Sequence, residues 1–143
     1  MVELIRRSQK LLDDTIAGKA DEVSKAIEDI RNTQYAPTFY SDEQALRYVI
    51  KFAYIAAIEQ YLKIEELPSG KGIADVVYLP KRKSTRPALV VELKWNKSSE
   101  GAIEQIKEKN YPAVIKDYGG EILLVGINYD EKLKTHSCVI ERI

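Results

Sequence analysis

The chain has 143 residues, of which 45% are hydrophobic and 31% are charged, so its length and composition predict one soluble globular protein with a proper hydrophobic core. The 22 basic and 22 acidic side chains cancel, which argues against a protein whose whole surface coats nucleic acid. There is no apolar run of the roughly 20 residues that a membrane span needs, no signal-peptide pattern at the N-terminus, and one cysteine, so we expect a cytoplasmic protein without a membrane partner.

Two helices are expected at the start of the chain. Apolar residues recur at helical spacing over 4–16, and a second helix with one apolar face is expected over 20–32. The segment that follows contains Pro37 and favours an extended linker. We therefore expect an N-terminal helical hairpin over 1–34 and a second domain over 35–143.

A third helix is expected to begin at Ser41. Ser41 and Gln44 have the spacing of a capping box, in which each side chain satisfies a backbone amide of the first turn. The residues that follow have a broad apolar face, which predicts a helix that continues to about Leu62 and packs on a sheet.

Strands are expected next, over 64–67, 73–79 and 88–95, with a turn between the first two. Ser98 or Ser99 then caps a helix that ends before Pro112 or continues to Tyr118.

Two more strands are expected, over 121–129 and 136–143. The first is the most apolar of all and should be central, whereas the last should be an edge strand. This order of elements predicts an α/β fold.

Charged residues interrupt two of these strands. Glu92 and Lys94 are two residues apart, so they leave the same face of an extended strand, and Leu93 faces the other side. Asp75 belongs to the preceding strand. A folded protein accepts such charges only where they are paired, solvated at a cleft or bound to a metal.

The chemistry of these side chains fits phosphodiester hydrolysis. Two carboxylates on neighbouring strands can hold Mg²⁺ or Mn²⁺, and the bound ion acidifies a water molecule and neutralises charge on a phosphoryl oxygen. A lysine beside the ion can orient the water and stabilise the transition state. The chain has one cysteine and one histidine, and it lacks Gly-x-Ser-x-Gly, His-Glu-x-x-His and Walker-type phosphate-loop patterns, so other hydrolytic chemistries fit poorly.

These residues carry a resemblance to a known family. Gly72-Ile73-Ala74-Asp75 followed by Glu92-Leu93-Lys94 resembles the PD-(D/E)XK nuclease superfamily, with alanine at the usual proline position. The helix from Gln105 to Tyr111 is similar to the Gln-x5-Tyr element of several subgroups. The segments AIEQIKEKNY and ILLVGINYD resemble most closely the nuclease-like C-terminal domain of AAA-ATPase-like bacterial proteins. The resemblance covers essentially the whole chain and is strongest over 70–130.

The resemblance implies a restriction-endonuclease-like core, which is a mixed central sheet flanked by helices with elements in the order αβββαβ, preceded by the helical hairpin. It also implies a Mg²⁺- or Mn²⁺-dependent nuclease that cuts DNA. It implies metal ligation by Asp75, Glu92, the backbone carbonyl of Leu93 and the early-helix acid Glu43. An ATPase domain or another protein is implied as a partner.

The same resemblance makes Lys94 the catalytic lysine beside Asp75 and Glu92, with Gln105 next to it in contact with the substrate or with Lys94. Alternatives stay open for several of these residues. Glu43 could simply interact with the helix dipole, Gln105 could be an exposed helix residue, and Glu92 with Lys94 could belong to a cross-strand ion pair.

Basic residues suggest where nucleic acid could bind; these are Lys81, Arg82, Lys83, Arg86 and Lys97. The alternative for the first four is a solvated hairpin tip. His136 is expected on the surface of its strand, and Cys138 is expected to be an inert core residue. The competing function is a catalytically silent module that binds nucleic acid or a partner protein.

Overall fold

A computed structural model of the chain describes residues 2–34, 42–69, 72–81, 84–108 and 120–143. Within strands it leaves undescribed the side chains of 66–69 and 72–75. Among the described residues, no helix is long and apolar enough to cross a membrane.

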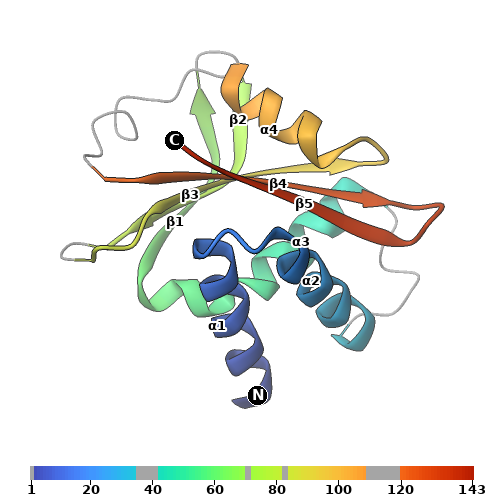
Figure 1. The fold of residues 1–143 in the computed structure, drawn as a ribbon, viewed down its shortest axis with the longest axis horizontal. Coiled ribbons are helices and arrows are strands. Elements are labelled where there is room, and N and C mark those ends of the chain that lie inside the picture. The colour runs from blue at the N-terminus through green and yellow to red at the C-terminus, as the bar shows by residue number, and fades with distance from the viewer. Residues whose placement is uncertain (1, 35–41, 70–71, 82–83, 109–119) are drawn as a thin grey trace.

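A five-stranded mixed sheet forms the centre of the molecule (Figure 1). Its strands lie in the order in which they occur along the chain, and they are β1 (Tyr61–Ser69), β2 (Gly72–Pro80), β3 (Ala88–Trp95), β4 (Ile122–Asp130) and β5 (Thr135–Arg142). All neighbours are antiparallel except β3 and β4, which are parallel. A parallel pair needs a crossover connection, and the segment containing α4 (Ser99–Glu108) provides it. The α/β fold with a mixed sheet is confirmed.

Helices cover both faces of the sheet, but unequally. One face carries α1 (Val2–Ile16), α2 (Ala20–Gln34), α3 (Glu43–Ala53) and a short 3₁₀-helix, η2 (Ile55–Glu59), while α4 lies on the other face (Figure 1). Between the first group and the sheet lies a large apolar core, which we call the major core. The layer under α4 is much smaller and consists of Val77, Val90, Ile103, Ile106 and Leu124, which we call the minor core.

Strand alternation assigns each side chain of β3 to one of these cores. Leu89, Val91 and Leu93 are fully buried in the major core, whereas Val90 belongs to the minor core. Successive side chains of a strand point to opposite faces, so Glu92 and Lys94 lie on the face that α4 covers.

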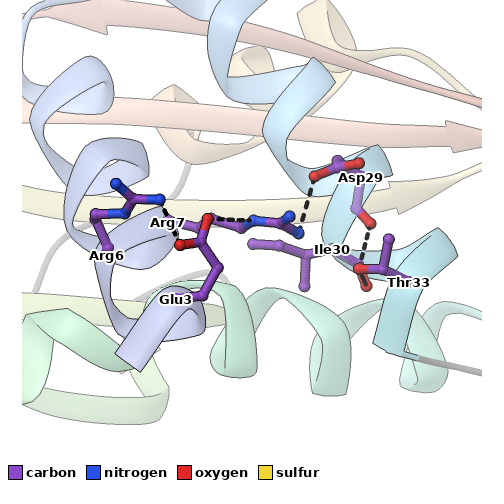
Figure 2. A network of polar contacts seen from close by, with 6 residues as sticks. All are labelled: Glu3, Arg6, Arg7, Asp29, Ile30 and Thr33. Atoms are coloured by element: carbon purple, nitrogen blue, oxygen red, sulfur yellow. Dashed lines mark hydrogen bonds and ion pairs between the residues drawn. The ribbon is translucent and has the colours of Figure 1, made fainter. Parts of the chain in front are cut away.

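The helical hairpin of α1 and α2 is held together at its surface by Arg7. Its guanidinium lies 3.4 Å from Glu3 of its own helix and 3.1 Å from Asp29 of α2, while Arg6 also contacts Glu3 (Figure 2). Gly18 makes the turn with a φ of 77°, a conformation that glycine adopts without strain. The apolar faces of both helices contribute to the major core. The division at residue 34 into two domains stays a prediction.

Helix α3 is shorter than the sequence pattern predicts. It ends at Ala53, and β1 begins at Tyr61, although we expected a helix to about Leu62. The reason is a distant side chain: the hydroxyl of Ser8 donates to the carbonyl of Ala53 at 2.6 Å and accepts from the amide of Ala56 at 2.9 Å. A continuing α-helix would use that carbonyl for its own next turn, so the chain tightens into η2 instead.

The cap of α3 also differs from the prediction by one residue. Asp42 is the N-cap, and its carboxylate accepts a hydrogen bond from the amide of Ala45 at 2.9 Å. Aspartate is as good an N-cap as serine, so the sequence permitted either residue. Ser41 lies outside the described residues.

The other elements agree with the predicted ones within a few residues. The bounds of β3 are as predicted, β5 is an edge strand, and β1 is longer than the predicted 64–67. Strand β4 lies inside the sheet, next to the middle strand β3. The continuation of α4 beyond residue 108 lies outside the described residues.

His136 is buried, which corrects the prediction of a surface residue. Its side chain is fully covered because α2 packs on β5, and its backbone amide donates to the carboxylate of Glu28 at 2.8 Å. The ring also packs on Tyr129, with centroids 4.8 Å apart. Burial, with a smaller contribution from Arg31, lowers the pKa of His136 to about 3, so the imidazole is neutral at pH 7.

Candidate active site

The face of β3 under α4 carries a buried carboxylate. Glu92 is 3% exposed, although its neighbours Val91 and Leu93 belong to the major core on the opposite face. A charged group at such a position requires polar or ionic compensation, because burial of an isolated carboxylate is costly. Glu92 is therefore a buried charged group in an otherwise apolar part of β3.

Lys94 lies on the same face, one step further along β3. It is half-buried, and its ammonium group donates a hydrogen bond to the side-chain oxygen of Gln105 on α4. The structure thus brings these two residues together and fixes the lysine head group against the helix. An ammonium group has three donors, so this contact leaves two for other partners.

Gly126 lets α4 approach the sheet beside Glu92. In the parallel ladder of β3 and β4, Glu92 is the partner of Gly126. A Cβ atom on Gly126 would lie 2.5 Å from the backbone oxygen of Ser99 and 3.1 Å from Ala102, so no larger residue fits without a shift of the helix. The first turn of α4 is also fixed by its cap, because the hydroxyl of Ser98 accepts from the amide of Gly101 at 2.9 Å.

Asn128 completes this face, and sequence reasoning did not single it out. It is the partner of Lys94 in the ladder, it is 4% exposed, and its side-chain oxygen accepts from the amide of Lys97 at 2.9 Å. The available signal was an amide residue inside the apolar run ILLVGIN, because a polar residue at a buried strand position needs partners.

Asp75 lies in β2, next to this site in the sheet. Val76 is the ladder partner of Val91, so Asp75 and Glu92 are the next residues at the same end of two neighbouring strands. The side chain of Asp75 is outside those described, and its role as ligand and catalytic residue stays a prediction. Among the described side chains there is no group of three or more histidine, cysteine or acidic residues that could hold a metal ion.

The remaining two predicted metal ligands are the backbone carbonyl of Leu93, on β3, and the carboxylate of Glu43, on α3. The side chain of Leu93 is buried in the major core, and only its backbone carbonyl was proposed as a ligand. Glu43 is exposed in the first turn of α3, which packs on the other face of the sheet. Metal ligation by Glu43 stays a prediction, and so does the alternative that its carboxylate interacts with the helix dipole.

The predicted basic loop lies at the other end of the sheet. It connects the end of β2 to the start of β3, and Arg86 precedes Glu92 by six residues, which corresponds to roughly 20 Å of strand. Arg86 also lies 3.5 Å from the carboxylate of Asp13, and Lys81 is exposed. Arg82 and Lys83 lie outside the described residues. The described residues of this loop, Lys81 and Arg86, lie away from Glu92 and Lys94.

Lys97, in contrast, lies at the same end of the sheet as Lys94. It is exposed in the loop between β3 and α4, next to Asn96, whose φ of 56° is a conformation that asparagine adopts more readily than most residues. Of the predicted nucleic-acid contacts among the described residues, Lys97 is thus the one near the buried carboxylate.

Cys138 is half-buried against the major core, on the far side of the sheet from Glu92. Burial raises the pKa of its thiol to about 12, so the reactive thiolate is scarcely populated at neutral pH. This agrees with an inert packing role.

Comparison with known proteins identifies the family model that describes the PD-(D/E)XK nuclease superfamily, which matches residues 41–138. Among solved structures, the chain is similar to the crystal structure of a repair endonuclease from Pyrococcus abyssi, with 28% identity and a TM-score of 0.38. That match covers 64% of this chain but only 38% of the solved one, so the chain spans less than half the length of that protein. A comparison with curated proteins found no match.

Proposed function

The chain belongs to the PD-(D/E)XK nuclease superfamily, and from this premise we propose that it is a metal-dependent nuclease that hydrolyses phosphodiester bonds of DNA. One observation supports this proposal above all others. The motif Glu92-Leu93-Lys94 has its acid buried and its lysine hydrogen-bonded to Gln105 on the face that α4 covers.

The donor set fits a hard divalent cation. Glu92 and Asp75 would hold Mg²⁺ or Mn²⁺ through carboxylate oxygens, with the carbonyl of Leu93 and, by resemblance, Glu43 as further ligands. A bound ion also explains why a carboxylate is kept in an otherwise apolar strand, because it compensates the buried charge. When bound, it supplies Lewis-acid activation of water and charge neutralisation at the phosphoryl oxygen.

The side chains of this face supply positioning and charge. Gln105 orients the Lys94 ammonium group, whose free donors can hold the attacking water and a phosphoryl oxygen as negative charge develops there. Asn128 and Gly126 act indirectly, because the first accepts from the loop that follows Lys94 and the second allows α4 to lie close. Precise placement of these groups is what raises the rate.

The proposal is tested with plasmid and single-stranded DNA in Mg²⁺ or Mn²⁺. Lys94→Ala should lower cleavage by about 10² or more, the size expected for loss of one transition-state donor. Lys107→Ala is the matched control, since Lys107 is exposed on α4 and paired with Glu141 at 2.6 Å. Equal cleavage by the parent and Lys94→Ala would refute the assigned role.

Metal binding has a readout that does not depend on cleavage. A ligand that binds only the folded state raises the thermal midpoint, so titration with Mn²⁺ should stabilise the parent and Lys94→Ala alike. Asp75→Ala should abolish that shift and could stabilise the metal-free protein by removing repulsion with Glu92. An undiminished shift in Asp75→Ala would place the ion elsewhere.

A second candidate function is a silent module of the same fold that binds nucleic acid or a partner protein. The zero net charge favours it, since a nuclease usually attracts DNA with a basic surface. By the resemblance described in the sequence analysis, that partner would be an ATPase domain. A parent protein that binds DNA without cutting it in either metal would establish this function instead.

A further inference from the structure

A shallow depression lies where β3 and β4 end, close to Lys94. It has a volume of about 460 Å³ and is lined by Asn96, Lys97, Asp130, Glu131 and Lys132; we call it the strand-end depression. Residues 96 and 97 follow β3, whereas residues 131 and 132 belong to the turn between β4 and β5. Two segments more than 30 residues apart thus share one concave surface beside the candidate active site.

Backbone and side-chain hydrogen bonds fix these two segments to each other. The side-chain oxygen of Asn96 accepts from the amide of Glu131 at 2.7 Å, and its amide nitrogen donates to the Glu131 carboxylate at 3.2 Å. The backbone amide of Asn96 donates to the carbonyl of Tyr129 at 2.7 Å. The depression is therefore a built feature, whose rim has a defined geometry relative to β3.

The acids and the lysines that line the depression differ in whether other groups of the protein already hold them. The Asp130 carboxylate accepts from the backbone amides of Lys132 and Leu133 at 2.9 and 3.0 Å, and Glu131 is held by Asn96. Lys97 and Lys132 are exposed, and among the described residues neither ammonium group forms an ion pair. The acids keep their charge but are held in the turn by these hydrogen bonds, whereas the two exposed lysine side chains can turn toward an anionic ligand.

Other basic groups of the molecule are less suitable. Arg6, Arg7 and Lys10 of α1 are each paired with an acid, as Figure 2 shows for the first two. The loop that contains Lys81 lies at the opposite end of the sheet from Lys94. Lys97, by contrast, is three residues from Lys94, so their Cα atoms are at most roughly 11 Å apart. Lys97 is thus close enough to Lys94 for both to contact nearby phosphates of one strand.

We propose that the strand-end depression binds the phosphate backbone of the nucleic-acid strand on one side of the bond at Lys94, with Lys97 and Lys132 as the phosphate contacts. This inference rests on the proposed function. It assigns Lys132 to substrate binding and makes Asn96 a positioning residue that holds both lysines on one rim. It also predicts that the loop with Lys81 contributes little to binding.

The test measures binding separately from cleavage. A fluorescently labelled single strand is titrated in EDTA at several salt concentrations with the parent and with Lys97→Gln/Lys132→Gln. Loss of two phosphate contacts should weaken binding and make the slope of log K against log salt shallower by about 1.4. Lys81→Gln/Lys134→Gln is the matched control, because it removes the same charge from exposed lysines outside the depression. Lys97→Arg/Lys132→Arg should restore the parental slope.

Cleavage by the parent in Mg²⁺ and Mn²⁺ then separates the two proposals. If the parent cuts DNA and the depression variant binds with the parental slope, the inference is wrong and the nuclease proposal stands. If the parent binds but never cuts, and the slope falls only in the depression variant, the inference holds and the nuclease proposal fails. A parent that neither binds nor cuts nucleic acid refutes both, and an equal loss in the control variant refutes the inference.

Discussion

The two faces of the central sheet use the same strands for different purposes. The face under α1, α2 and α3 is apolar and buries the larger core, whereas the face under α4 has a small core and carries Glu92 and Lys94 at its end. On β3 the change from one purpose to the other takes a single residue, because Leu93 between them belongs to the major core. We therefore expect substitutions on the two faces of β3 to have separate effects, on stability under α1, α2 and α3 and on the proposed chemistry under α4.

The sharpest test of this comparison is Leu93→Ala. The leucine is fully buried, so its truncation leaves a cavity and should lower the free energy of unfolding by about 2–5 kcal/mol in a denaturant titration. Leu133→Ala is the control, because that leucine is 71% exposed and should change stability by less than about 0.5 kcal/mol. Similar small losses in both variants would contradict the assignment of Leu93 to the core.

The second prediction concerns the pH dependence of stability, which we attribute to the buried His136 on the face of the sheet that α2 covers. The pKa of His136 is lowered to about 3 in the folded protein, against an ordinary value near 6.5. The contribution of the neutral His136 imidazole to the free energy of unfolding is therefore fully present above pH 6.5. It is lost as the pH falls toward 3, because over this range the imidazole binds a proton in the unfolded chain but not in the folded protein. Stability should fall by up to about 2 kcal/mol between pH 6.5 and pH 5.

Replacement of the imidazole isolates this effect. His136→Phe should show a shallower decline over the same range, measured by denaturant unfolding at each pH. Carboxylates titrate in both the parent and His136→Phe, so their effect cancels in the difference between the two stability curves. If both proteins decline equally, protonation of His136 is not responsible.

The third test concerns the contact between α4 and the sheet. Gly126→Ala should cost about 1–3 kcal/mol of stability, since the added methyl group meets backbone at Ser99 and the helix must shift. Gly101→Ala is the comparison, because its methyl group would meet the flexible hydroxyl of Ser98 and should cost less. The loss of stability in each variant is measured by thermal unfolding. An equal or larger loss in Gly101→Ala would show that α4 does not lie close to the sheet at Gly126.

The smallest expected effect is that of Lys94→Ala on stability. Lys94 is half-buried and makes one hydrogen bond to Gln105, so its loss should change the free energy of unfolding by about 1 kcal/mol or less. The contrast with its neighbour Leu93 is the point of the experiment. A loss of stability as large as that of Leu93→Ala would mean that side chains on the face under α4 also contribute strongly to stability.

The sequence predicted those features that depend on local pattern. The limits of β3 follow from an apolar run between Pro87 and Asn96, and the shared face of Glu92 and Lys94 follows from strand alternation. The position of the basic loop could also have been inferred, because a loop that precedes a strand by definition lies at its start. Arg86 and Glu92 therefore had to be far apart.

Features that depend on distant residues could not be predicted in this way. Helix α3 ends early because Ser8, 45 residues away, takes the carbonyl of Ala53, and no local signal near Ala53 indicates this. His136 is buried because α2 packs on β5, with Glu28 contacting it across 108 residues of sequence. Asn96 and Lys132 likewise become neighbours only through the β3–β4 pairing.

The packing of α2 on β5 also bears on how the protein is made. The amide of His136 bonds to Glu28, and Arg142 bonds to the carbonyl of Ile16 at 3.0 Å, so the final strand completes contacts with the first two helices. During synthesis the ribosome releases α1 and α2 long before β5. Until β5 follows, the apolar face of the hairpin lacks part of its cover, and such exposed apolar surface favours aggregation.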